Sequence, residues 1–316
     1  MKSKVSIIVP VYNCEKMIGN TLERLVKQTL KEIEIVCVND GSTDDSLEIL
    51  NRWTKKDKRI KVVNQKNGGL SAARNTGIRN ASSPYLMFCD GDDLFDKKMC
   101  KIMVNAIERE DVDIVACGTE VKYDAHSEIA GSDENYYRIK FVGRRYIDDE
   151  ITAKTDVSVC DKLFKAELIN KNKICFPNDL NNEDYYFYNA YMSVAKTIYF
   201  VNQKLYTYIR HEDSIMSENF EKKKFSIDHL IVAEELFNFY EKNGFLKGHR
   251  DLFWRQWIAS FWFSYEHSGE QYFSWIREEA NKFLDNNYEK FKPFDKELQK
   301  MKDDIVKVLN KRSNNG

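Results

Sequence analysis

The chain alternates short apolar runs with amphipathic stretches over its first 117 residues, and this alternation constrains the fold more than any other feature. Apolar runs of this length, bounded by polar or turn-forming residues, are typical of strands buried on both faces of a sheet. The predicted strands cover residues 5–9, 33–38, 60–63, 85–89 and 112–117. Predicted helices fall between them, near residues 18–26, 47–53, 71–78 and 97–108. This order predicts an α/β fold with an open, mostly parallel sheet and helices on both faces.

The N-terminal and C-terminal parts of the chain differ in residue composition. Nine of the thirteen glycines precede residue 150, whereas helix formers, lysines and aromatic residues dominate after about residue 218. A polar and charged stretch at residues 215–222 marks the predicted boundary. We therefore expect a first domain over residues 1–218 and a helical C-terminal region over residues 219–316.

Composition excludes several functional classes. Hydrophobic residues make up 42% of the chain and charged residues 31%, which are ordinary values for a globular protein. The 49 basic and 50 acidic residues nearly cancel, so no overall positive field attracts nucleic acid. The sequence holds no run of about 18 apolar residues, as a membrane span would need. Seven cysteines, an odd number without metal-ligand spacing, favour a reducing compartment, and we expect the protein in the cytoplasm.

Unusual residues gather where the predicted strands end, which is where open α/β sheets bind ligands. The first strand ends in residues 9–13 (VPVYN), and the second in residues 39–46 (NDGSTDDS). Asp40 can accept a hydrogen bond from a ring N–H, as in uracil, or from a ribose hydroxyl. The same residues also suit a plain turn with helix caps, and Asn13, Ser42 and Thr43 are candidate caps for the helices that follow.

The next cluster, residues 67–77 (NGGLSAARNTG), leads into a predicted helix. Glycines at a helix start, with the forked donor of Arg74 nearby, suit a diphosphate. Small residues are equally suited to close packing of this helix on the sheet. Both interpretations stay open at this point.

Three carboxylates close the fourth predicted strand, in residues 89–93 (CDGDD). Their mutual repulsion is costly unless a cation neutralises it. Mg²⁺ and Mn²⁺ prefer oxygen ligands and commonly combine one or two carboxylates with substrate phosphates. We therefore predict a divalent metal site here, with Asp93 as an alternative cap for the next helix.

Together these clusters resemble family 2 of the inverting glycosyltransferases, which have the GT-A fold. The matching segments are residues 9–13, 39–46, 70–77 and 90–93, followed more loosely by residues 160–164 (CDKLF), 182–185 (NEDY), 206–211 (YTYIRH) and Ser214. The resemblance implies a donor-binding half over residues 1–118 and an acceptor-side half over residues 119–218. It departs from the family at Cys160, where an aromatic residue is usual.

Carried over residue by residue, the resemblance implies a donor site and a metal site. Pro10 and Tyr12 would line the nucleoside, Asp40 would recognise uracil, and Arg74 would lie near the base or phosphate. The resemblance places Asp90 near the ribose and Asp92, with Asp90, at a Mn²⁺ or Mg²⁺ ion. The donor-binding set is completed by Arg210 and His211, which would lie at the diphosphate. His211 could alternatively complete the metal site.

The resemblance also implies a general base. Asp184, supported by Glu183, would take the proton from an acceptor hydroxyl while the sugar leaves a UDP-sugar with inversion. By themselves, two acidic residues are equally typical of a helix start. The expected acceptor is a glycan or lipid-linked glycan in bacterial surface polysaccharide or lipooligosaccharide synthesis. The alternatives are a nucleotidyltransferase, which usually carries a glycine-rich phosphate loop that residues 9–13 lack, and a non-catalytic sugar-nucleotide-binding protein.

One stripe of aromatic and aliphatic residues stands out in the C-terminal region, at helical spacing over residues 253–265. A core helix is one interpretation. A homodimer interface or a peripheral contact with the inner face of the cell membrane are the others. The chain beyond Lys290 reads as an amphipathic, lysine-rich helix.

Overall fold

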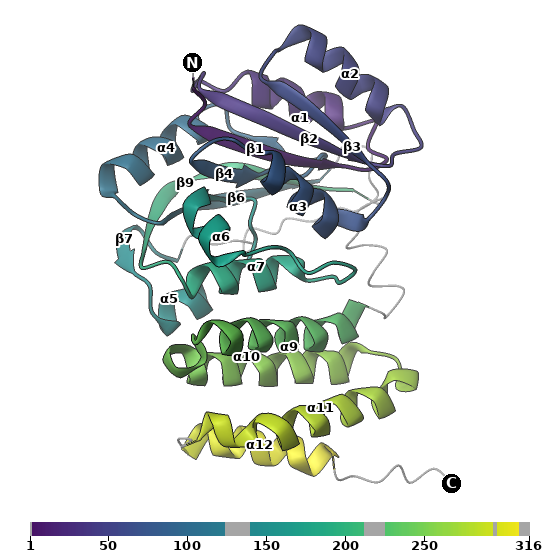
Figure 1. Cartoon of the computed structure of the whole chain (residues 1–316), viewed down its shortest axis with the longest axis vertical. Helices are drawn as coiled ribbons and strands as arrows, with labels where there is room; N and C mark the ends of the chain where they lie inside the picture. Colours follow the sequence, from purple (N-terminus) through teal and green to yellow (C-terminus); the bar gives the residue numbers. More distant parts are fainter. Residues whose placement is uncertain (1, 124–139, 212–224, 293–295, 310–316) are drawn as a thin grey trace. The chain divides into compact units, whose positions relative to one another are not determined.

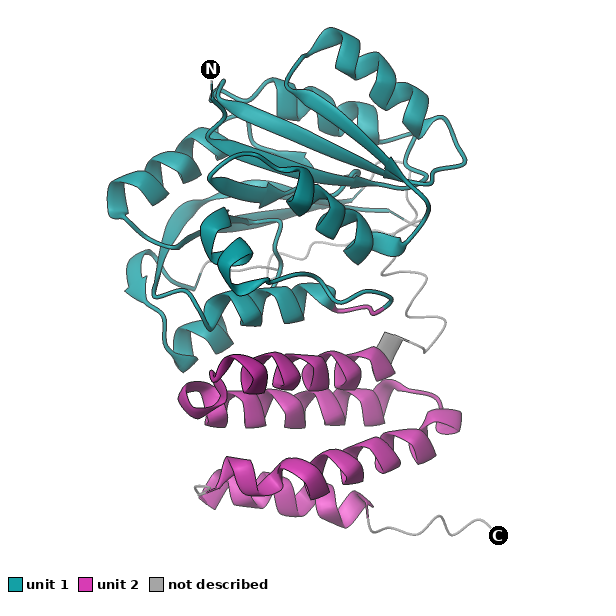
Figure 2. Ribbon diagram, in the orientation of Figure 1, with its two compact units in different colours: residues 1–179, 183–214 teal, residues 180–182, 215–316 magenta. Residues whose placement is uncertain are grey.

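The computed structural model describes the whole chain except residues 1, 124–139, 212–224, 293–295 and 310–316. The predicted boundary at residues 215–222 and Ser214 therefore lie outside the described residues. The chain forms two compact units, residues 1–179 with 183–214 and residues 180–182 with 215–316 (Figure 2).

The first unit is built on a mixed sheet, and its described strands follow the order β3-β2-β1-β4-β8-β6-β9-β5, with β7 paired to β9 (Figure 1). The strands are β1 (Val5–Val11), β2 (Ile33–Asp40), β3 (Ile60–Gln65), β4 (Tyr85–Phe88), β5 (Leu94–Phe95), β6 (Ile114–Tyr123), β7 (Gly143–Tyr146), β8 (Lys162–Lys165) and β9 (Thr197–Arg210). Strands β1 to β4 pair in parallel, whereas β8 is antiparallel to both β4 and β6. The predicted α/β class with a mostly parallel sheet is confirmed.

The helices of this unit are α1 (Ile18–Val26), α2 (Ser46–Lys56), α3 (Gly69–Asn80), α4 (Met99–Glu110), α5 (Asp149–Lys154), α6 (Ala166–Asn172) and α7 (Glu183–Met192). Helix α3 covers one face of strands β1 to β3, and helices α1 and α2 cover the other face (Figure 1). A Cβ atom added to Gly77 would lie 2.2 Å from Cγ2 of Ile8, so this glycine lets α3 approach β1 closely. The small residues of α3 thus serve helix–sheet packing.

The predicted helix caps were wrong. Helix α1 begins after Met17 and α2 after Asp45, and neither helix has a side-chain cap. Asn13 instead has a left-handed φ of 48° and accepts a hydrogen bond from the Thr43 backbone N–H at 2.8 Å. This contact joins the loops that follow β1 and β2, so residues with cap chemistry here hold two strand ends together.

The second unit is helical, and its described elements are α9 (Phe225–Asn243), α10 (Leu246–His267), η1 (Glu270–Tyr272), α11 (Phe273–Asn287), η2 (Tyr288–Phe291) and α12 (Lys296–Leu309). The aromatic stripe of α10 is largely interior. Phe253, Trp254 and Trp257 are fully buried and lie among aromatic rings of α9, α11 and η2. Of the three interpretations of the stripe, the structure therefore shows the core helix. None of the described helices is both long and apolar enough to cross a membrane.

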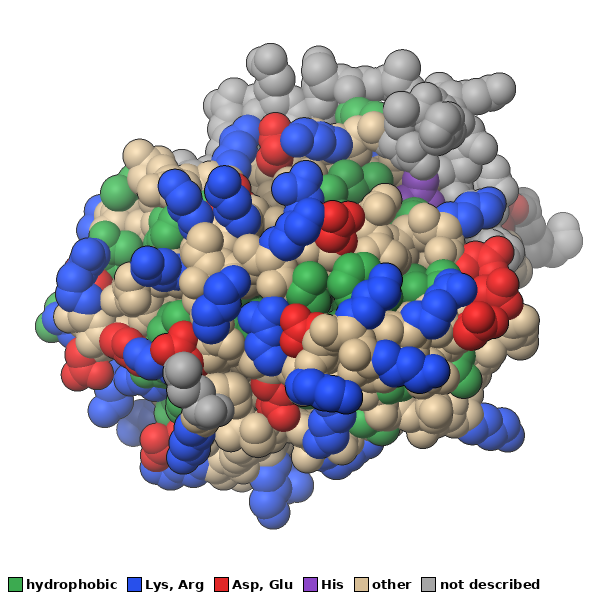
Figure 3. Space-filling view, turned by 90° about the horizontal axis from the view of Figure 1, so that it is seen from above, with side chains coloured by type: hydrophobic (Ala, Val, Ile, Leu, Met, Phe, Trp, Pro, Cys, Tyr) green, Lys and Arg blue, Asp and Glu red, His purple; other side chains and the backbone are tan. Residues whose placement is uncertain are grey.

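Charge is mixed on the surface as it is in the composition. The face shown in Figure 3 carries Lys and Arg side chains scattered among acidic and apolar ones.

Candidate active site

The strand ends meet at one edge of the sheet because β1, β2 and β4 run in parallel. Val11 pairs with Asn39, and Ile8 pairs with Phe88. Asp40, the last residue of β2, and Tyr12 and Asp90, which follow β1 and β4, are therefore gathered at the same edge.

Asp40 is buried at this edge, with 3% of its surface exposed. Its Oδ1 accepts hydrogen bonds from Gln65 Nε2 at 2.7 Å and Gly68 N at 2.9 Å, and its Oδ2 accepts one from Gly69 N at 2.8 Å. Gly69 has a φ of 82°, which favours glycine. The N–H groups of Gly68 and Gly69, which suit a diphosphate by their place at a helix start, thus donate to the Asp40 carboxylate. All three hydrogen-bond donors to this carboxylate are neutral.

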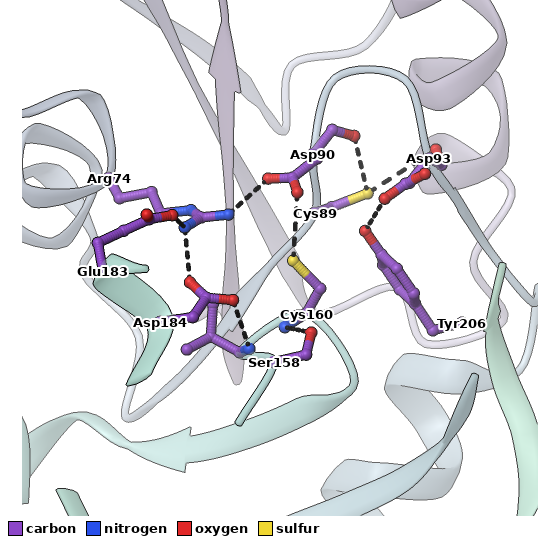
Figure 4. A network of polar contacts seen from close by, with 10 residues as sticks. Arg74, Cys89, Asp90, Asp93, Ser158, Cys160, Glu183, Asp184 and Tyr206 are labelled. Carbon is purple, nitrogen blue, oxygen red and sulfur yellow. Dashed lines mark hydrogen bonds and ion pairs between the residues drawn. The ribbon is translucent and has the colours of Figure 1, made fainter. Parts of the chain in front are cut away.

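Arg74 lies at the centre of a second cluster, shown in Figure 4. Its guanidinium is 2% exposed and donates to Glu183 Oε1 at 2.7 Å, Asp184 Oδ1 at 2.7 Å and Asp90 Oδ1 at 2.9 Å. The guanidinium also lies over the ring of Phe176, 5.3 Å from its centre. Helix α3 therefore places one cation between the acidic turn after β4 and the first turn of α7.

The remaining oxygens of this cluster face the loop that precedes β8. Asp184 Oδ2 accepts a hydrogen bond from Val159 N at 3.1 Å, and Asp90 Oδ2 lies 3.7 Å from Cys160 Sγ (Figure 4). Cys160 thus contacts the Asp90 carboxylate at the position where the resemblance has an aromatic residue. The residue pattern did not predict either contact, because one donor is a backbone N–H and the other contact joins residues 70 positions apart.

Burial dominates the protonation of the acidic pair. It raises the pKa of Glu183 to about 7, against the opposing effect of Arg74 and with the help of the neighbouring Asp184 charge. Burial likewise raises the pKa of Asp184, again opposed by Arg74. Burial disfavours the charge of Arg74, yet Asp184, Asp90 and Glu183 raise its pKa well above the ordinary value. A carboxylate pair of this kind can take up a proton near neutral pH.

Asp92 and His211 form a third group. His211 Nε2 lies 2.9 Å from Asp92 Oδ2, and the Asp92 side chain is 31% exposed. Within the described residues, no three His, Cys, Asp or Glu side chains are arranged to hold a metal ion together. An oxygen donor beside an imidazole nonetheless fits Mn²⁺ or Mg²⁺ when phosphate oxygens complete the ligands. Asp90, the other expected ligand, is turned toward Arg74 and Cys160 instead.

The other predicted site residues lie outside these three groups. Pro10 is buried in β1, and a Cβ atom added to Gly91 would lie 3.1 Å from its carbonyl oxygen, so the acidic turn packs on this strand end. Tyr12 is 52% exposed just beyond β1. The Arg210 guanidinium lies 6.0 Å from the ring centre of Tyr123, on the neighbouring strand β6.

The family model for glycosyl transferase family 2 matches residues 6–170, which is about half of the chain. The chain belongs to glycosyl transferase family 2. It is 32% identical over 231 residues to the uncharacterized glycosyltransferase EpsJ of Bacillus subtilis (strain 168), covering 67% of this chain and 62% of that relative. The chain thus spans less than two thirds of the length of this relative.

Solved structures agree on the fold. S. aureus TarS 1-349 in complex with UDP-GlcNAc superposes with a TM-score of 0.60 and 22% identity, covering 97% of this chain and 89% of that one. The mannosyltransferase PcManGT from Pyrobaculum calidifontis, in complex with GDP-Man and Mn²⁺, gives a TM-score of 0.55 and 15% identity, covering 98% of this chain and 86% of that one. At these identities the likeness shows the GT-A fold, with a helical C-terminal region.

Proposed function

We propose that this glycosyltransferase moves a sugar from a UDP-sugar to a hydroxyl of a glycan or lipid-linked glycan, with inversion at the anomeric carbon. One observation carries the proposal. Asp184, a partly buried carboxylate whose pKa is raised by desolvation, is joined through Arg74 to Asp90 at the strand-end edge. This arrangement suits Asp184 as the base for the acceptor hydroxyl, because Arg74 fixes its position relative to Asp90, near which the donor would bind.

In the proposed step, the acceptor oxygen bonds to the anomeric carbon while the bond from that carbon to the diphosphate oxygen breaks. Asp184 takes the acceptor proton. Arg74 and the Val159 N–H each bind one Asp184 oxygen and so fix its orientation. Glu183 shares the Arg74 nitrogen with Asp184 and acts as the supporting carboxylate.

The donor would lie along the strand-end edge. Asp40 Oδ2 accepts one protein hydrogen bond where Oδ1 accepts two, so Oδ2 has capacity left for the uracil ring N–H. Exposed Tyr12 would stack on the base beside Pro10, and Asp90 would lie near the ribose. The diphosphate would then fall near Arg210 and His211.

Asp92 and His211 would hold a Mn²⁺ or Mg²⁺ ion, which supplies positive charge opposite the leaving diphosphate when it is bound.

All seven cysteines are free and six of them are buried, which supports the assignment to a reducing compartment such as the cytoplasm.

The test is a panel of UDP-sugars with Mn²⁺, with release of UDP as the measured quantity. With the active donor, Asp184→Asn should lower kcat by about 10²- to 10⁴-fold, the usual worth of a general base, and leave UDP affinity unchanged. Glu183→Gln is the matched control, because it removes the neighbouring carboxylate and should lower kcat much less. Turnover by Asp184→Asn at the wild-type rate would remove Asp184 from the mechanism.

A further inference from the structure

Asp93, the third carboxylate of the acidic turn, does not cap the following helix. It is 1% exposed and accepts a hydrogen bond from the Tyr206 hydroxyl (Figure 4). It accepts another from Ile209 N at 2.8 Å. Both donors belong to β9, more than a hundred residues further along the chain. Asp93 therefore joins the turn after β4 to the last residues of β9.

Backbone pairing supports the same junction. Directly after Asp93, Leu94 and Phe95 pair antiparallel with Thr207 and Tyr206. The Phe95 and Tyr206 rings pack edge to face, with their centres 5.8 Å apart. The acidic turn and the end of β9 are thus fixed to one another by side-chain and backbone contacts together.

This junction lies beside the candidate cation site on both sides. Asp93 directly follows Asp92, and Ile209 comes two residues before His211. The contact between His211 Nε2 and Asp92 Oδ2, at 2.9 Å, therefore depends on how the turn and the strand end are aligned. A small shift of one against the other would separate the two groups.

We propose that Asp93 is a positioning residue that, with Tyr206, holds the end of β9 so that His211 stays against Asp92. The buried carboxylate, costly to desolvate, is retained because it accepts from a side chain and from the backbone at once. A purely stabilising role would need no such connection to His211. The inference rests on the proposed function, in which Asp92 and His211 hold the cation.

The first experiment compares two buried tyrosines. Tyr206→Phe removes one donor to Asp93. Tyr191→Phe is the control, since the Tyr191 hydroxyl is equally buried but bonds Asp113 O at 2.7 Å and Lys165 N at 2.9 Å. Calorimetric titration of Mn²⁺ into each protein with UDP should show an affinity about five- to tenfold weaker for Tyr206→Phe, as expected for loss of one ordinary hydrogen bond. Tyr191→Phe should match the wild type.

A double-mutant cycle then tests the connection to His211. If Asp93 and Tyr206 act through His211, Tyr206→Phe should have no further effect on Mn²⁺ affinity in a His211→Asn background. Asp93→Asn, which keeps one acceptor oxygen, should weaken Mn²⁺ binding less than Asp93→Ala. Equal affinities of Tyr206→Phe and the wild type, or additive effects in the cycle, would overturn the proposal.

A third measurement needs no cation. With ¹³C-labelled histidine, the His211 signal is identified by its loss in His211→Asn, and Tyr206→Phe should shift or broaden it while Tyr191→Phe should not. An unchanged signal contradicts the positioning role. The two proposals can also fail separately. If the wild type binds no Mn²⁺ with UDP but the His211 signal still shifts in Tyr206→Phe, the proposed function is contradicted. The alignment of His211 by Asp93 is then still supported.

Discussion

Two corners of the same sheet edge hold buried negative charge in different ways. The Asp40 carboxylate is bound by three neutral donors, Gln65 and the N–H groups of Gly68 and Gly69. Around Arg74, by contrast, three carboxylates share one guanidinium. The first corner is satisfied without any counter-charge, whereas the second keeps an excess of negative charge that favours proton uptake. We infer that rigid recognition belongs to the Asp40 corner and proton transfer to the Arg74 cluster.

The largest expected effect comes from removing the shared cation. Arg74→Ala leaves three partly buried carboxylates without their partner and should lower the free energy of unfolding by about 3–5 kcal/mol. Urea denaturation measures this change. Arg59→Ala is the control, because the Arg59 side chain is 24% exposed, against 2% for Arg74, and pairs with one carboxylate, that of Asp57, so its loss should cost about 1 kcal/mol. Equal losses for the two variants would mean that the Arg74 cluster carries no special charge balance.

The second prediction concerns pH. Because burial raises the pKa of Glu183 to about 7 and also raises that of Asp184, the pair binds a proton as the pH falls through this range. The deprotonated base is then lost, so the pH profile of kcat at saturating donor should have an acidic limb. Along this limb kcat should fall by about tenfold for each pH unit. Glu183→Gln removes a like charge and should move the limb to lower pH. A kcat that stays flat from pH 8 to pH 5.5 would contradict the role of the acidic pair.

The smallest effect is expected at the Asp40 corner. Asp40→Asn turns one acceptor oxygen into an amide donor that faces donors, so UDP affinity should weaken about tenfold while kcat stays within a fewfold of the wild type. Calorimetry with UDP measures the affinity. Asp45→Asn makes the same change of charge at an exposed position of the same loop and should leave the affinity unchanged. A lower kcat with unchanged UDP affinity would reverse the assignment of the two corners.

The local pattern of the sequence was enough to predict the sheet and its ligand-binding edge. Apolar runs predict buried strands, and the acidic turn at Asp90 is hard to explain as a surface feature. Residue chemistry alone could not decide what Arg74 binds, because its partners Glu183 and Asp184 lie about 110 residues away. The small residues of α3 suited both a diphosphate and close packing, and only the distance from Gly77 to Ile8 shows the packing.

Contacts that depend on tertiary alignment left no trace in the sequence. Asn13 has the chemistry of a helix cap, yet it binds the Thr43 backbone because its left-handed conformation turns it toward the next strand end. Asp93 also suits a cap, but it instead accepts hydrogen bonds from Tyr206 and Ile209. The pairing of β5 with β9 brings these two donors close to Asp93. In both cases a long-range partner competes with the local one.

The central claim is that the edge of this sheet binds a uridine nucleotide together with a divalent cation. Titration calorimetry of UDP into the wild type, with and without Mn²⁺, tests it most directly, with Asp92→Asn as the variant that weakens the cation site. We predict that Mn²⁺ tightens UDP binding by about tenfold or more in the wild type and much less in the variant. Binding of UDP that is the same with and without Mn²⁺, or no binding at all, would contradict the account.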